Sequence, residues 1–134
     1  MPTYRIREAA DLLGVSDDTV RRWADAGRLA TGTDAADRQV VDGAALAEFA
    51  RRQAEDATHP DPGPVASLSA RNRLVGLVTR VTRDTVMAQV EMQSGPHRIV
   101  SLMSREAADD LGLEPGVLAV ASIKSTNVVV EVPR

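Results

Sequence analysis

Hydroxyl and cationic side chains gather in two short stretches that lie far apart in a chain of 134 residues. Ser69 and Arg71 form the first stretch, and Lys124, Ser125 and Thr126 form the second. Such side chains supply hydrogen-bond donors and positive charge, which a tetrahedral oxyanion requires instead of His or Cys ligands. By type alone, however, these residues are more typical of a turn, a surface ion pair and a solvated lysine.

A second set of donors lies on one side of a predicted helix and on the segment that follows it. Its members are Ser16, Thr19, Arg21, Arg22 and Arg38. Hydroxyls and arginines suit contacts to phosphates and base edges in a major groove. The net charge of −3 and the nearby acids Asp17, Asp18, Asp34 and Asp37 oppose such contacts, because phosphate neutralisation dominates the affinity. A module that contacts protein instead of DNA therefore remains an alternative.

The composition excludes several other kinds of site. There is no cysteine, so disulfides and Cys-based zinc sites are excluded. The two histidines, His59 and His97, have no partner at metal-ligand spacing, and no catalytic nucleophile motif or Gly-rich phosphate loop stands out. No apolar run approaches the roughly 20 residues of a membrane span. We expect a cytoplasmic protein that is not an enzyme and does not contact a membrane.

Helices must position the donors of the N-terminal half. Ile6, Ala9, Ala10 and Leu13 share one face of a helix, which Gly14 can end. Ser16 can cap a second helix, and the short turn between the two predicts a helix-turn-helix. Residues 38–41 can return as a strand of a small wing, and Asp42 can cap a third helix. The three prolines in residues 55–67 indicate a linker.

Strands must position the donors of the C-terminal half, because its apolar residues alternate. The pattern predicts strands beginning near Leu74 and over residues 86–92, 99–103, 117–123 and 128–132, with a helix capped by Ser104 after the third. Five strands with this helix suggest a small barrel of oligonucleotide-binding (OB) type. The predicted fold class is α+β with two small domains, residues 1–54 and 68–134, joined by the linker 55–67.

Residues 3–54 resemble the winged helix-turn-helix of the MerR, BldC and excisionase families. The resemblance is carried by Gly-Val-Ser at the turn, Thr-Val-Arg-Arg-Trp in the second helix and Ala-Gly-Arg-Leu after it. It implies that Arg21 and Arg22 contact DNA from the helix and Arg38 from the wing. The wing departs from the families' Gly-Gly-His-Arg-Arg, because it reads Asp-Ala-Ala-Asp-Arg-Gln over residues 34–39.

Residues 68–134 resemble the molbindin (Mop) domain, which also occurs within TOBE domains. The matching motifs are Ser-Ala-Arg-Asn near the start, Leu-Gly-Leu-Glu-Pro-Gly in the middle and Ser-Ile-Lys-Ser-Thr-Asn-Val near the end. The resemblance implies that molybdate or tungstate is bound by the first and last motifs, mainly at interfaces of a homo-oligomer, a dimer or larger and possibly a hexamer. It also implies backbone contacts near Ser101. Position 125 is commonly alanine in these relatives.

Together the two resemblances predict a molybdate-responsive, DNA-binding transcriptional regulator. One alternative is an oligomeric store for molybdate or tungstate whose N-terminal module does not bind DNA. Another is an excisionase-like architectural DNA-binding protein whose barrel serves only for assembly.

Overall fold

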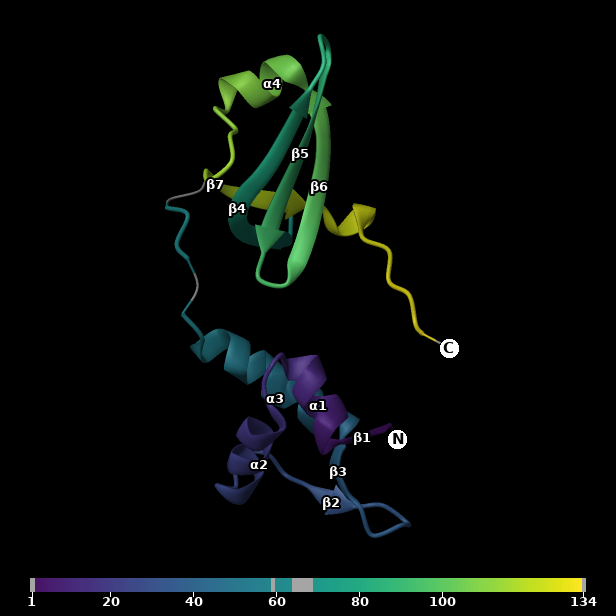
Figure 1. Cartoon of the computed structure of the whole chain (residues 1–134). Coiled ribbons are helices and arrows are strands. Elements are labelled where there is room, and N and C mark those ends of the chain that lie inside the picture. The colour runs from purple at the N-terminus through teal and green to yellow at the C-terminus, as the bar shows by residue number, and fades with distance from the viewer. Residues whose placement is uncertain (1, 59, 64–68, 134) are drawn as a thin grey trace. The chain divides into compact units, whose positions relative to one another are not determined.

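The chain divides into two compact units, Met1–Thr58 and His59–Arg134. The computed structural model describes residues 2–58, 60–63 and 69–133 (Figure 1). Residues 64–67 of the predicted linker and residue 68, where the second domain was predicted to begin, lie outside the described residues, as does His59.

The N-terminal unit is a helix-turn-helix with a small wing. Its elements are β1 (Thr3–Arg5), α1 (Ile6–Leu13), α2 (Asp17–Asp25), β2 (Gly32–Thr33), β3 (Gln39–Asp42) and α3 (Gly43–Asp56). The three strands form an antiparallel sheet in the order β1-β3-β2. The predicted winged helix-turn-helix is confirmed, although α3 runs to Asp56 and so takes in the first two residues of the predicted linker.

Local capping signals set the ends of these helices as predicted. Gly14 ends α1 in the left-handed conformation, with φ of 70°. The Ser16 hydroxyl accepts a hydrogen bond from the Thr19 amide at 3.2 Å, and an Asp42 carboxylate oxygen accepts one from the Ala45 amide at 3.1 Å. The interior behind the helices holds the fully buried Val20 and Val41, whose burial contributes about 1.5–3 kcal/mol each.

The C-terminal unit is a curled antiparallel sheet with one short helix. Its elements are β4 (Asn72–Arg83), β5 (Met87–Ser94), β6 (His97–Ser104), α4 (Arg105–Asp110), β7 (Leu118–Ile123) and a 3₁₀ turn, η1 (Ser125–Asn127). The strand order is β6-β5-β4-β7. Ser104 caps α4 through a hydrogen bond from the Ala107 amide, as predicted. The α+β class and the OB-like form of this unit are therefore confirmed.

The long strand β4 holds the curled sheet together because its two halves pair with different neighbours. Residues 72–77 pair with β7, and residues 77–83 pair with β5. Before a register shift between Val78 and Arg80, Val78 is 2% exposed and Leu77 is 51% exposed, and after the shift Val81 packs against the same core as Val78. The simple alternation predicted for this strand is therefore wrong. The strand also begins at Asn72, two residues before the predicted start.

The predicted fifth strand is wrong for the single chain. Residues 128–132 follow η1 as extended backbone outside the four-stranded sheet, and in Figure 1 this segment leaves the sheet toward the C-terminus. Val129, Val130 and Val132 are 83%, 84% and 85% exposed. A strand needs a neighbouring edge to pair with, and alternation of side chains cannot supply one. Within the described residues, β6 and β7 consequently remain the two edges of an open sheet.

Candidate functional site

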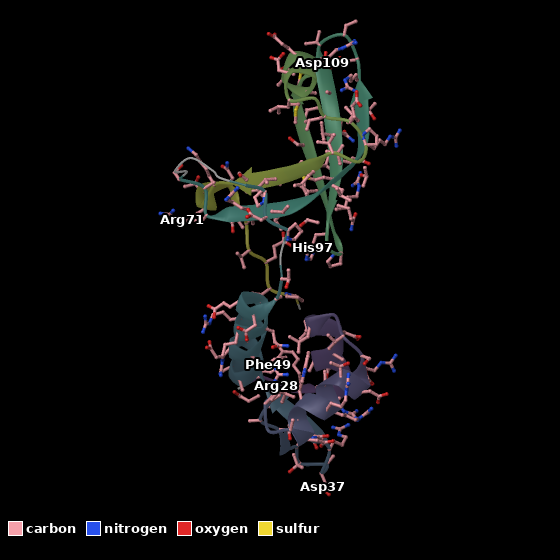
Figure 2. All side chains as sticks on the ribbon, turned by 90° about the vertical axis from the view of Figure 1, so that its left-hand side faces the viewer. Arg28, Asp37, Phe49, Arg71, His97 and Asp109 are labelled. Atoms are coloured by element: carbon pink, nitrogen blue, oxygen red, sulfur yellow. The ribbon has the colours of Figure 1, made fainter. Side chains whose placement is uncertain are left out.

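The two donor stretches of the C-terminal unit meet at one end of the β4–β7 pair. The antiparallel register places Asn72 opposite Ile123. Arg71 precedes Asn72 and Lys124 follows Ile123, so both cations lie at this end of the sheet. Figure 2 shows Arg71 at the tip of this ribbon. Two residues separated by 53 positions in sequence thus lie at the same sheet end.

Like charges at one end of a sheet repel each other, and an anion bound there would relieve the repulsion. Arg71 and Lys124 are exposed, and so are Ser69, Ser125 and Thr126. The backbone here is held by η1, in which the Asn127 amide donates to the Lys124 carbonyl at 2.9 Å. One cation and two hydroxyls therefore lie on a hydrogen-bonded turn, and Arg71 and Ser69 lie at or just before the start of β4; donors of these types can bind a small oxyanion.

Asn72 links the two stretches and was not among the predicted site residues. Its side-chain amide donates to the Ile123 carbonyl at 3.2 Å, and the side chain is half-buried. This bond ties the residue after Arg71 to the residue before Lys124. No sequence pattern indicated this hydrogen bond, because the partner is 51 residues away.

Ser101 lies apart from the other predicted oxyanion residues in the order of the strands. It is on β6 opposite Val90, and β5 and β4 separate β6 from β7. It borders an apolar cavity of about 470 Å³ whose opposite wall is β7, including Ser122 and Ile123. Ser101 is therefore at the open side of the sheet, whereas Arg71 and Lys124 are at its end.

The predicted DNA-contacting residues at the N-terminal part of α2 lie together, and three of them, Ser16, Thr19 and Arg22, are joined by hydrogen bonds. The Thr19 hydroxyl is 2.9 Å from the Ser16 hydroxyl and accepts a hydrogen bond from Arg22 Nη2 at 3.2 Å. Arg21 Nη1 is 3.3 Å from Asp18 Oδ1. Exposed ion pairs of this kind are worth only about 0–1 kcal/mol, so a phosphate could replace the carboxylate at little cost.

Arg38 is held in the wing by Asp34. The Asp34 carboxylate accepts hydrogen bonds from the backbone amides of Arg38 and Ala36, both at 2.9 Å, and lies 3.0 Å from Arg38 Nε. These donors, the Arg38 amide first, lower the pKa of Asp34. Asp37 occupies the tip of the turn with φ of 61°, and Figure 2 shows it at the far end of the wing. The wing thus presents acid next to its arginine.

Two further arginines lie near the start of α2 and were not predicted as DNA contacts. Arg5 and Arg7 line the same surface hollow as Arg21, together with the acids Glu8 and Asp17. The signal in the sequence was an arginine on each side of Ile6, at the start of the first helix. The helix-turn-helix resemblance points instead to the second helix and the wing.

Two negative findings apply to the residues that the structure describes. No group of three or more His, Asp or Glu side chains there is arranged to hold a metal ion. No helix among them is long and apolar enough to cross a membrane.

Comparisons with known proteins match each unit separately. Residues 68–130 match the TOBE domain, and residues 3–54 match a helix-turn-helix domain. Molybdenum-pterin-binding protein 3 of Clostridium pasteurianum is 38% identical over 65 residues, which are 48% of this chain and 96% of the relative. Molybdenum-pterin-binding protein MopA of Rhodobacter capsulatus is 36% identical over 74 residues, which are 54% of this chain and 27% of that protein.

Solved structures of similar sequence also match the C-terminal unit. A molybdate-binding protein from Sporomusa ovata is 30% identical with a TM-score of 0.48, and the match covers 49% of this chain and 98% of that one. Because the C-terminal unit aligns with nearly the whole of the Clostridium protein at 38% identity and matches the TOBE domain, the chain belongs, through this unit, to the family of TOBE-domain molybdenum-pterin-binding proteins.

Proposed function

We propose that this protein is a cytoplasmic, molybdate-responsive transcriptional regulator. Its C-terminal unit binds molybdate, or the near-isosteric tungstate, and its helix-turn-helix unit binds DNA. The observation that carries the oxyanion part is the pairing of Asn72 with Ile123, which brings Arg71 and Lys124 to the same end of the sheet. The similarity to molybdenum-pterin-binding proteins of Clostridium pasteurianum and Rhodobacter capsulatus supports a molybdenum oxyanion as the ligand.

The proposed anion site is held by hydrogen bonds and charge alone. Molybdate is a dianion whose metal already carries its full set of oxygens, so the protein needs donors. Arg71 and Lys124 supply the charge, while Ser69, Ser125 and Thr126 supply hydroxyls. Ser101 joins the site only through a second copy or through a change in the open side of the sheet. Charge-assisted hydrogen bonds contribute about 1.5–3 kcal/mol each.

A homo-oligomer completes this proposal. In one chain the five donors at the sheet end are exposed, and water competes with them for the anion. A second copy placed over the sheet end would exclude that water. Anion binding at such an interface favours the assembled state by mass action, and assembly joins two or more DNA-binding units at a raised effective concentration.

Titration calorimetry with molybdate, and with sulfate in parallel, tests the anion site. We expect heat that is selective for molybdate. Arg71→Ala or Lys124→Ala should weaken the affinity about 10- to 100-fold, which corresponds to the loss of one charge-assisted hydrogen bond. The matched control is Arg80→Ala, which removes an exposed arginine from the middle of β4. No heat with molybdate, or equal losses in all three variants, would overturn the site.

The DNA part is tested by mobility shift with and without molybdate. The wild type should show DNA binding that molybdate changes, and Arg22→Ala should lower the affinity in both states. Arg51→Ala, on the exposed face of α3 and paired with Glu48 at 2.7 Å, is the control.

A second function is favoured by the acids on the DNA face. Asp18 pairs with Arg21, and Asp34 pairs with Arg38, so two of the predicted DNA contacts are already neutralised. This arrangement favours an oligomeric store for molybdate or tungstate with an N-terminal unit that does not bind DNA. Molybdate binding without any DNA retardation at low salt would identify the store.

A further inference from the structure

A surface hollow of about 560 Å³ in the N-terminal unit joins the start of α1, the start of α2 and the wing strand β3. It is called the arginine hollow below, and its lining includes Arg5, Arg7, Glu8, Asp17, Arg21 and Gln39. We propose that the arginine hollow binds the phosphate backbone of DNA and that Arg5 and Arg7 make the contact. This inference rests on the DNA part of the proposed function and adds to it the residues that bind the backbone.

The arginine hollow lies between the two elements that the proposed function places on DNA. In a helix-turn-helix the second helix enters the major groove, and the first helix crosses the sugar-phosphate backbone. Asp17 and Arg21 belong to the N-terminal part of α2, and Gln39 follows directly after Arg38 of the wing. Phosphates border every groove, so a surface between a groove-binding helix and a wing lies over the backbone.

Arg5 and Arg7 differ from the other arginines of the N-terminal unit because their guanidinium groups are unpaired. Within residues 2–58, neither group has an ion pair or a side-chain hydrogen bond, and both side chains are exposed. The remaining arginines each bind another side chain of the unit: Arg21, Arg22, Arg28, Arg38, Arg51 and Arg52. A phosphate at Arg5 or Arg7 therefore displaces water only, whereas a phosphate at Arg21 competes with Asp18.

The backbone that carries the two arginines is fixed before any ligand binds. β1 pairs with β3 in the wing sheet (Figure 1), and Arg5, the last residue of β1, lies opposite Val40. The Arg5 amide donates to a Glu8 carboxylate oxygen at 3.0 Å. Ile6, between the two arginines, is buried in the core of the unit. Binding a phosphate therefore orders two side chains and no backbone, which keeps its entropic cost low.

The acids of the arginine hollow limit its attraction for phosphate. Glu8 and Asp17 line it together with the arginines, and each carries a negative charge that opposes the approach of DNA. The Glu8 carboxylate also holds the Arg5 amide, a role that a glutamine side chain can take over. Glu8→Gln therefore removes the charge while it keeps the start of α1 in place, and we expect it to tighten DNA binding.

The salt dependence of binding to a short mixed-sequence DNA duplex tests the contact, because phosphate contacts do not depend on base sequence. In the full chain, Arg5→Ala combined with Arg7→Ala should weaken binding about 10- to 100-fold at low salt. The slope of log affinity against log salt concentration should become shallower by about two, since each phosphate contact contributes about 0.9. Arg5→Lys combined with Arg7→Lys should keep most of the slope, because lysine also binds phosphate as a point charge.

The matched control is Arg51→Ala combined with Arg52→Ala, which removes the same charge from the exposed face of α3 and should leave the slope nearly unchanged. Circular dichroism checks that every variant is folded. Equal losses of slope in the two alanine pairs would overturn the contact, since they would indicate a general effect of charge. An unchanged slope in the Arg5 and Arg7 pair, with weaker binding in Arg22→Ala, would refute only the arginine hollow. A wild type that binds no duplex at low salt would overturn the DNA part of the proposed function as well.

Discussion

Replacing Gly76 with alanine should unfold the C-terminal unit at a markedly lower temperature. Gly76 lies on β4 next to Leu77, where the strand passes from its pairing with β7 to its pairing with β5. A Cβ atom added at Gly76 would lie 2.2 Å from the Gln93 carbonyl oxygen and 3.0 Å from the Ser94 Cα. Ordinary contact begins at 3.4 Å, so the β5 backbone would have to move by more than 1 Å.

The magnitude follows from what that movement breaks. Inserting a methyl group into a closely packed site costs about 1–3 kcal/mol. The displacement also strains the hydrogen bond from the Ser94 hydroxyl to the Val75 carbonyl, 2.7 Å long and part-buried, which is worth about 1 kcal/mol. At roughly 4–8 °C per kcal/mol for a domain of this size, a total of about 2–4 kcal/mol lowers the unfolding temperature by about 8 °C or more.

Thermal unfolding followed by circular dichroism measures this shift. The control is Gly32→Ala, because Gly32 has no neighbour within 4 Å of an added Cβ and its φ is not positive. Gly76→Ala should also weaken molybdate binding, since Gly76 lies in the half of β4 that leads to Arg71. An unchanged unfolding temperature for Gly76→Ala would show that the close approach of β4 and β5 does not exist in solution, and the register built on it would have to be revised.

Three further predictions concern single side chains. Asp34→Asn should tighten DNA binding, because it removes an anion from the predicted DNA-contacting face and releases Arg38. The slope of log affinity against log salt concentration should steepen by about one, which mobility shifts at several salt concentrations measure. Unchanged binding would mean that the wing does not contact DNA. Ser16→Ala should lower the free energy of unfolding of the helix-turn-helix unit by about 1 kcal/mol, because the α2 cap is lost, and denaturant titration measures this. The control is Ser125→Ala, which removes an exposed hydroxyl that caps no helix and should leave the stability unchanged. The backbone amides of Met87 and Val86 lower the pKa of Asp84, so its contribution to stability is complete above the ordinary carboxyl range, near 3.9, and disappears as the pH drops through the lowered value. Between about pH 7 and pH 3, the free energy of unfolding should therefore decrease less in Asp84→Asn than in the wild type. Identical pH profiles for the two proteins would contradict this role of Asp84.

The features that the sequence determined are those with local causes. Gly14, Ser16, Asp42 and Ser104 bound their helices because a cap forms between residues three or four positions apart, and no distant part of the chain is needed. The alternation in residues 86–92 likewise predicted a buried face, since side chains on a strand change sides at every residue. Ala88, Val90 and Met92 are buried as predicted, whereas Val86 precedes β5 and is 67% exposed. The division into helical and strand halves followed from the same periodicities.

The tertiary structure decided whatever depends on a partner far away in the chain. The pairing of β4 with β7 brings Arg71 to Lys124, and no local pattern fixes a register between strands 50 residues apart. The bulge between Val78 and Arg80 depends on the pairing with β5, and it allows Val78 and Val81, three positions apart, both to pack in the core. Alternating valines at residues 128–132 predicted a strand, yet this segment lies outside the four-stranded sheet. Alternation shows that a segment suits a sheet, but a strand forms only where an edge with free backbone groups is within reach.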